Sequence, residues 1–261
     1  MFKFEDNKCY RMPAHFGGGV FDPDARACVH DAVSIQLSYT TDGDRLADYL
    51  PEGFELRKPE LSIVYQQLGQ VDWLAGSGYN LIWVAAPVRF NGQRDQMEGD
   101  FALVVWENKT TPILTGREMG VPKIYADIED LQILGETYRT RASYESSTFL
   151  QMEMTRQDPL GELQVKALQG DINVLGWRYV QKIGGPGAEV SQPTLFPMRS
   201  EPDSAWMGRG TIQWTQLKWE QNPMQWWIIK ALAELPIIEM APVTMTRGRQ
   251  FLMDSRGRVL K

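Results

Sequence analysis

Apolar and polar residues alternate along much of this chain, which predicts β-strands. Residues 33–39, Val-Ser-Ile-Gln-Leu-Ser-Tyr, alternate without a break, which is the period of a strand with one buried face. Similar patterns predict further strands at 61–67, 79–90, 100–107, 148–154, 163–169, 173–182, 210–219 and 237–246. Most of the chain is therefore expected to be strand.

Two helices are expected to interrupt this pattern. The first is predicted within 41–53, where Thr41 or Asp42 can cap the N-terminus and a proline and a glycine end the helix. The second is predicted at 223–235, where Asn222 can act as the cap, a proline occupies the first position and apolar residues form a thick face. Another proline follows this helix and stops it.

These elements predict an α+β fold, with one antiparallel sheet or barrel and a few peripheral helices. No fixed-period repeat is present, and the Gly/Pro/Ser-rich run 184–203 is interpreted as a long connection and not as a domain boundary. A single domain covering residues 1–261 is therefore expected. At 43% hydrophobic residues, a chain of this length can bury a core of its own.

Charge and targeting signals limit the classes of partner. The chain carries 27 basic and 33 acidic side chains, a net charge of -6, and no basic cluster, which argues against nucleic acid. No window approaches the ~18 apolar residues that a membrane span requires, and the start lacks the apolar stretch of a signal peptide. We expect a cytoplasmic protein without a membrane partner.

The residue inventory also limits the chemistry. The only histidines are His15 and His30, and Cys9 and Cys28 lack a CxxC spacing, so a His/Cys metal cage is not expected. A site for magnesium made of carboxylates alone stays open. Nucleotide-binding glycine motifs and a G-x-S-x-G nucleophile elbow are absent. The chemistry is expected to come from lysine, arginine, carboxylates, tyrosines or the backbone.

One segment combines a lysine with an unusually apolar neighbourhood. It contains Gly116-Arg117-Glu118-Met119-Gly120-Val121-Pro122-Lys123. Burying an ammonium without a partner disfavours its charged form and makes a free amine available, which Schiff-base catalysis on a ketone needs. A lysine in a Gly-x-Pro-Lys turn is also common at the surface, where its charged end reaches water.

The same segment resembles a known family. Gly116-Arg117-Glu118 followed by Gly120-x-Pro122-Lys123-x-x-Ala126 is similar to the G-R-E-x-x-G-x-P-K-K-x-A signature of the acetoacetate decarboxylase superfamily, whose lysine after the proline forms the Schiff base. Other elements that match in the same order are Met12-Pro13-x-His15-Phe16-Gly17, Pro51-Glu52, Pro87-Val88-x-Phe90-Asn91-Gly92 and Glu234-Leu235-Pro236-Ile237-x-Glu239. The resemblance covers roughly residues 12–247 and implies a barrel of the double-β-cone type and a homo-oligomer. It also implies Lys123 as the Schiff-base residue, with no separate cofactor or metal.

The chain departs from the decarboxylase pattern at several positions. Met119 stands alone between Glu118 and Gly120, where the family has two residues, and Ile124 replaces the second lysine. Desolvation is then left as the way to obtain a free amine. The positions of the decarboxylases' pocket carboxylates and arginine fall at Leu81, Tyr65 and Ala32. The chain therefore resembles more the pyruvate aldolase-dehydratases and the hydratases of unsaturated keto acids.

Residue roles follow from this resemblance and from the strand pattern. Lys123 is the expected Schiff-base residue, Tyr79 and Glu118 are candidates for proton transfer, and Arg117 is a candidate for binding the substrate carboxylate. Residues expected to line the substrate site are Tyr65, Leu81, Trp83 and Phe90. Structural alternatives stay open: Tyr79 and the tryptophans can be core residues, and Arg117 can form an ion pair with Glu118.

The leading functional hypothesis is a Schiff-base lyase that acts on 2-oxo acids such as pyruvate, with an aldehyde as a possible co-substrate. One alternative is a decarboxylase of a 3-oxo acid such as acetoacetate, against which the missing lysine and carboxylates argue. Another is a non-catalytic protein that binds keto acids or other small ligands, with Lys123 as a carboxylate clamp. The one-residue deletion before Gly120 favours this last alternative.

Overall fold

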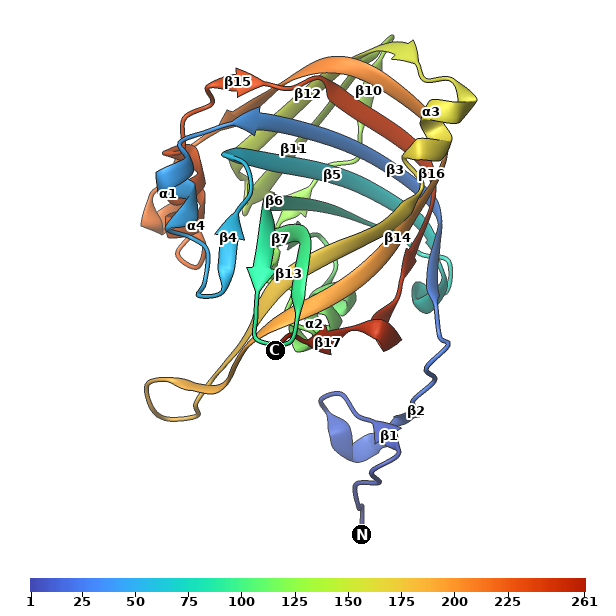
Figure 1. Cartoon of the computed structure of the whole chain (residues 1–261), viewed down its shortest axis with the longest axis vertical. Coiled ribbons are helices and arrows are strands. Elements are labelled where there is room, and N and C mark those ends of the chain that lie inside the picture. The colour runs from blue at the N-terminus through green and yellow to red at the C-terminus, as the bar shows by residue number, and fades with distance from the viewer.

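The computed structural model describes all residues 1–261, and most of them lie in one large sheet (Figure 1). Its strands are β3 (Ala27–Thr40), β4 (Phe54–Leu56), β5 (Glu60–Val71), β6 (Tyr79–Asn91), β7 (Gln96–Glu107), β8 (Lys123–Tyr125), β9 (Asp127–Ile128), β10 (Gln132–Leu134), β11 (Thr137–Tyr144), β12 (Ser147–Pro159), β13 (Gly170–Gln181), β14 (Ala188–Trp214), β15 (Glu239–Met240), β16 (Val243–Leu252) and β17 (Arg258–Val259). Near the N-terminus, β1 (Lys8–Cys9) and β2 (Gly19–Val20) pair only with each other.

The sheet closes on itself as a ring. Hydrogen-bonded neighbours run from β3 through β5, β6, β7, β13, β14 and β16, and β16 pairs with β3 again. All pairings in the sheet are antiparallel except two, those of β7 with β13 and of β7 with β8. The predicted α+β fold with a barrel-like sheet is thus confirmed, with a parallel seam at β7 that the pattern did not predict.

The two faces of the ring strands have different surroundings. On β3, Ile35 and Leu37 belong to a main core cluster of 33 buried residues, which also contains side chains of β11, β12 and α4 (Trp226–Ala233). The alternate residues Ser34 and Gln36 line a cavity on the other face. The period of two that predicted this strand therefore separates the core from the cavity.

Four short α-helices lie around the sheet: α1 (Gly43–Ala47), α2 (Thr110–Glu118), α3 (Glu162–Ala167) and α4. Of the two residues predicted to cap α1, Asp42 does so: its side chain accepts a hydrogen bond from the backbone N–H of Arg45. The helix is shorter than the predicted span 41–53. None of the helices is long and apolar enough to cross a membrane.

Helix α4 begins three residues later than predicted and without its expected cap. Gln225 is the capping position, and the side chain of Asn222 is buried without a hydrogen bond. Gln225 instead ties the helix to the sheet: its Oε1 accepts from Trp106 Nε1 (2.7 Å), and its Nε2 donates to the carbonyl of Tyr125 (2.8 Å). These two long-range bonds connect the start of α4 to β7 and to the last residue of β8.

Residues 163–169, predicted as a strand, form α3 and its end. The alternation in Glu-Leu-Gln-Val-Lys-Ala-Leu fits a period of two, but Val165 is the one buried residue within the helix and Leu163 is exposed. The helix is started locally, since the side chain of Gln164 accepts from the backbone N–H of Gly161 (2.9 Å). Helix α2 was not predicted from the sequence either.

Most of the run 184–203, interpreted as a connection, is strand β14. Its prolines suggested an irregular segment because proline cannot donate to a ladder. The carbonyls of Pro193 and Pro197 accept from Leu260 (3.0 Å) and Met253 (3.1 Å), on the edge opposite β13. Since the N and C=O of one strand residue point to the same edge, the missing donors do not interrupt the pairing with β13.

We expect Gln225→Ala to destabilise the fold by about 1–3 kcal/mol, because it leaves the buried indole N–H of Trp106 without an acceptor. Urea unfolding at equilibrium measures the effect. Gln216→Ala removes an exposed amide from the loop that precedes α4 and serves as the control. Equal stability of the two variants would show that Gln225 does not anchor this helix.

Candidate active site

The parallel seam brings together a lysine and a carboxylate that lie far apart in sequence. Lys123 is the first residue of β8 and lies beside Val105 of β7, whose N–H donates to the carbonyl of Pro122 (3.0 Å). Glu107 follows Val105 by two residues on β7, so both side chains point to the same face of the sheet. That face lines the cavity.

The cavity inside the ring has a volume of about 290 Å³. Side chains of β3, β5, β6, β7, β13, β14 and β16 line it, together with the turn that precedes β8. Four of the residues expected at the site are among them: Lys123, Tyr79, Leu81 and Trp83. The structure thus brings these four together around one space.

Lys123 and Glu107 form a buried ion pair. Lys123 is 8% exposed and Glu107 is fully buried, and Lys123 Nζ lies 2.8 Å from Glu107 Oε1. Neither carboxylate oxygen has a hydrogen-bond partner beyond this ion pair. The expectation of a buried amine without a partner is therefore wrong, because a carboxylate directly faces the amine.

Burial raises the pKa of the Glu107 carboxyl, and the positive charge of Lys123 opposes this shift. A buried carboxylate with a raised pKa is a better proton acceptor than an ordinary one. Transfer of one proton from Lys123 to Glu107 leaves a neutral amine beside a neutral acid, with no unpaired charge in the cavity. The pair therefore holds a proton donor and a proton acceptor within hydrogen-bond distance of each other.

Tyr79 adds a proton donor to the cavity. It is 6% exposed and packs beside Leu68 and Leu81. Burial raises its pKa well above 10, and the negative charges of Glu107 and Asp254 add to this effect. The phenol therefore stays protonated near neutral pH. Tyr79 both contributes to a small apolar cluster and lines the cavity, so the structural and catalytic interpretations are compatible.

Helix α2 sets the position of Lys123. Gly116 lies against the lysine: a Cβ at this position would come within 2.5 Å of Lys123 Cε and 2.9 Å of Nζ. The carbonyl of Gly116 also accepts from the N–H of Val121 (3.1 Å). The glycine of the Gly-Arg-Glu motif is thus required for the lysine side chain to pass the helix and reach Glu107.

The deletion before Gly120 does not keep Lys123 out of the cavity. Met119 caps α2, and Gly120 has a φ of +90° with its N–H bonded to the carbonyl of Arg117 (3.1 Å). A Cβ at Gly120 would also collide with the side chain of Thr194. Glycine therefore closes a tight turn, and the shortened segment still delivers Lys123 to the seam.

Arg117 and Glu118 do not line the cavity. Arg117 is exposed, and its Nη1 donates to the backbone carbonyl of Lys123 (2.9 Å). Glu118 is exposed and pairs with Arg11 (3.5 Å) instead of with Arg117. Arg117 thus holds the lysine backbone, whereas Glu118 ties α2 to the N-terminal segment.

Tyr65 and Phe90 lie in the main core and not in the cavity. The Tyr65 hydroxyl donates to the carbonyl of Glu129 (3.2 Å), and its strand neighbours Val64 and Gln66 face the cavity instead. Phe90 packs against Phe54, with ring centroids 4.9 Å apart. A shift of one residue in counting along a strand exchanges the two faces, which explains the position of Tyr65.

Glu107 is the site residue that sequence reasoning missed. The pattern placed it at the end of the predicted strand 100–107 but assigned it no role. The signal was its spacing: it continues the alternate positions that lead from Leu103 and Val105 to the strand end. A carboxylate at such a position either reaches water or needs a buried partner.

A second polar cluster lies outside the cavity. His30 Nε2 is 2.8 Å from Asp72 Oδ1, Cys28 Sγ is 3.7 Å from His30 Nδ1, and the N–H of Cys28 donates to Asp72 Oδ2 (3.2 Å). The three groups offer metal-type ligand atoms within 4.8 Å of one another. The sequence led us to consider a His/Cys cage and a site of carboxylates alone, but not the mixed set that Asp72 completes.

Comparisons with known proteins agree with the fold. The Acetoacetate decarboxylase (ADC) family matches residues 11–249, most of the chain. No curated protein matches in a sequence search. The structure is similar to acetoacetate decarboxylase from Legionella pneumophila, with a TM-score of 0.75 and 20% identity over 94% of this chain and 92% of that chain.

Two further similar structures are those of other enzymes. The enduracididine biosynthesis enzyme MppR, complexed with the condensation product of pyruvate and imidazole 4-carboxaldehyde, gives a TM-score of 0.69 at 13% identity, covering 92% of this chain and 90% of that chain. An acetoacetate decarboxylase-like enzyme from Sphingomonas wittichii RW1 gives 0.71 at 16% identity, covering 94% and 96%. At such identities the likeness shows a shared fold, and the predicted resemblance is confirmed.

We expect Lys123→Met to destabilise the protein, because it leaves Glu107 buried without a partner. Lys123→Met/Glu107→Gln removes both charges and should restore most of the loss. The penalty of the single variant should be small near pH 5 and rise to about 3–5 kcal/mol at pH 8. The sign follows from the raised pKa of Glu107, because the folded state favours the protonated carboxyl. This contribution to the free energy of unfolding is lost as the pH rises above 4.5, the ordinary pKa of a glutamate.

Urea unfolding of the wild type and both variants at the two pH values measures this cycle. A Lys123→Met penalty that does not change with pH, or a double variant no more stable than the single one, would contradict a buried pair.

Proposed function

This chain belongs to the acetoacetate decarboxylase family, and on that premise we propose that it is a Schiff-base lyase that acts on 2-oxo acids through Lys123. One observation carries the proposal: Lys123 Nζ and Glu107 Oε1 lie 2.8 Å apart in the cavity, both buried. Such a pair keeps a nucleophilic amine and a proton acceptor in contact and away from water. Tyr79 supplies a second proton donor.

The reaction begins with proton transfer from Lys123 to Glu107. The free amine attacks the keto carbon of pyruvate, and the resulting carbinolamine loses water after Glu107 returns its proton to the hydroxyl, with Tyr79 as a hydrogen-bond donor. The iminium that forms draws electrons from the neighbouring methyl carbon. Glu107, again a carboxylate, removes a proton from that carbon, and an enamine results.

The enamine carbon then forms a bond to the carbonyl carbon of an aldehyde. Loss of the new hydroxyl as water gives an unsaturated iminium, and hydrolysis releases an unsaturated 2-oxo acid and restores Lys123. The sum is one pyruvate and one aldehyde converted to one product and one water. Run in reverse, the same steps hydrate or cleave an unsaturated keto acid.

The similar structures support a 2-oxo acid and an aldehyde as the substrates. MppR has been solved complexed with pyruvate and with the condensation product of pyruvate and an aldehyde. The cavity of this chain has Leu81 and Ala32 where the decarboxylases carry charged residues, and Glu107 is the one carboxylate that lines it. The apolar residues at these positions disfavour decarboxylation of a 3-oxo acid, because the charged groups that the decarboxylases carry there are missing.

Glu107 takes the proton-transfer role that the sequence assigned to Glu118, and Arg117 positions Lys123 through its carbonyl. Assembly into a homo-oligomer and a cytoplasmic location stay predictions. Helix α4 buries Ile229 and Leu232 in the core and leaves Trp227 half exposed as surface for such an assembly.

We expect sodium borohydride to trap a covalent adduct of pyruvate on Lys123, measured as intact mass and located by peptide mapping. Lys123→Met/Glu107→Gln, the stable variant without the amine, should trap none. Gly116→Ala should trap much less than Gly170→Ala, because a Cβ at Gly116 meets the lysine whereas the space around Gly170 is open.

Two outcomes would favour the alternatives. Release of carbon dioxide from acetoacetate, with no product from pyruvate and aldehydes, would support a decarboxylase. A folded wild type that forms no adduct with either acid, but melts at a higher temperature in their presence, would support a binding protein.

A further inference from the structure

A row of side chains crosses the cavity wall from Glu107. Glu107 lies opposite Leu81 on β6, Leu81 opposite Gln66 on β5, Gln66 opposite Ser34 on β3, and Ser34 opposite Thr246 on β16. All five line the cavity. Because neighbouring strands lie about 4.8 Å apart, the row is a continuous wall that leads away from the proton-transfer group.

The neighbouring row starts from Lys123, and it too passes from apolar to polar side chains. It passes through Val105 and Trp83 and ends in Gln36 and Thr244 on β3 and β16. Trp83 places an indole beside the first row, and Gln36 and Thr244 extend the amide and hydroxyl groups of its far end. Close to Lys123 the wall is apolar, and farther away it is polar and uncharged.

The polar groups of the first row have no partners within the protein. Gln66, Ser34 and Thr246 are half-buried, and their side chains take part in none of the chain's hydrogen bonds. An amide and two hydroxyls offer both donors and acceptors. A site that presents such groups favours a ligand that bonds to them over one that leaves them unmet.

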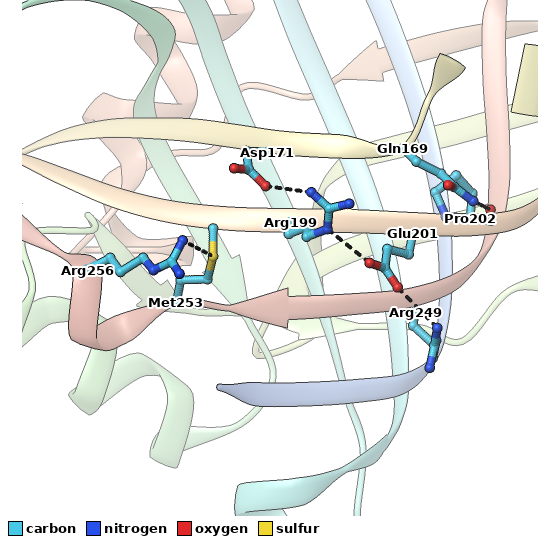
Figure 2. Close-up of polar contacts among 8 residues, drawn as sticks. All are labelled: Gln169, Asp171, Arg199, Glu201, Pro202, Arg249, Met253 and Arg256. Atoms are coloured by element: carbon cyan, nitrogen blue, oxygen red, sulfur yellow. Dashed lines mark hydrogen bonds and ion pairs between the residues drawn. The ribbon is translucent and has the colours of Figure 1, made fainter. Parts of the chain in front are cut away.

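Beyond Glu107 and Lys123, these rows carry no charge. The charged residues around the cavity are Glu107, Lys123 and Arg249. Figure 2 shows Arg249 paired with Glu201 (3.1 Å), which continues to Arg199 (2.9 Å) and from there to Asp171 (3.0 Å). The charge of Arg249 is therefore already balanced by this chain of ion pairs, and an anionic tail would gain little at the polar wall.

We propose that this wall selects the aldehyde co-substrate, and that the co-substrate is a short, uncharged aldehyde with several hydroxyl groups. The inference rests on the proposed function and names its second substrate class. Gln66 and Ser34 bind the hydroxyls nearest the new bond, Thr246 binds those farther along, and Trp83 packs against the carbon chain. These hydroxyls are bound and not consumed: the bond forms between the enamine carbon and the aldehyde carbon, and only the former aldehyde oxygen leaves, as water.

The test uses pyruvate with matched pairs of aldehydes, glyceraldehyde against propanal and erythrose against butanal, with benzaldehyde as an aryl probe. Product formation is followed by mass and by the absorbance of the unsaturated oxo acid. We expect kcat/KM to favour each hydroxylated aldehyde by roughly ten- to hundredfold over its deoxygenated partner.

Gln66→Leu, Ser34→Ala and Thr246→Val should raise KM for the hydroxylated aldehydes and leave that for propanal nearly unchanged. Gln213→Leu, which changes an exposed amide on β14 outside the cavity, is the control. The proposal is overturned if propanal or benzaldehyde is used as well as glyceraldehyde, if no aldehyde reacts, or if the variants affect all aldehydes equally.

The borohydride adduct with pyruvate alone separates this inference from the proposed function. If the adduct forms and the preference for hydroxylated aldehydes is absent, only the substrate class is wrong. If no adduct forms, the Schiff-base function fails, and this inference fails with it.

Discussion

The contact between Lys123 and Glu107 is the interaction on which the rest of the site depends. Two charges withdrawn from water are tolerated only because each faces the other, and the single carboxylate leaves the pair one proton away from neutrality. That proximity is set by the backbone. The parallel pairing of β7 and β8 places Lys123 beside Val105, and Glu107 follows on the same face.

The surroundings of the pair serve to keep it in this geometry. Gly116 leaves room for the lysine side chain, Gly120 closes the turn before β8, and Arg117 holds the lysine carbonyl. Each acts on backbone or packing and not on the reacting atoms. This division explains how a segment one residue shorter than the family signature still brings its lysine into the cavity.

The ring of strands separates two interior regions, the main core and the cavity, with a single sheet. One face of each ring strand packs into the main core with β11, β12 and α4, and the other lines the cavity. A closed ring has no free edge where it encloses the cavity, so the lining residues are held by ladders on both sides. Strand register therefore determines where the Lys123–Glu107 pair lies and where the polar side chains of the wall lie relative to it.

The sequence was sufficient for those parts of the structure that local pattern determines. Alternation predicted β3, β5, β6 and β7, and a motif identified Lys123. It was insufficient where distant segments decide. Glu107 has meaning only through a parallel pairing with a later strand, and Tyr65 was placed in the site in error by one position on β5.

Helix α3 and most of strand β14 are segments whose local sequence pattern predicted the wrong secondary structure. The prolines of β14 point their missing donors to the edge away from β13, which no composition reveals. Helix α3 has the alternation of a strand but buries one residue, so local capping outweighs the pattern.

The central claim is that Glu107 exchanges protons with Lys123, and the pH dependence of Schiff-base formation tests it most directly. The rate of adduct formation with pyruvate is measured by rapid quenching with borohydride, in the wild type and in Glu107→Gln. The wild-type rate should fall on acidification through one ionisation above 4.5, since burial raises the pKa of Glu107. Glu107→Gln should react roughly 10²-fold more slowly and lose that ionisation. A variant that reacts as fast as the wild type, with the same acid limb, would contradict the account.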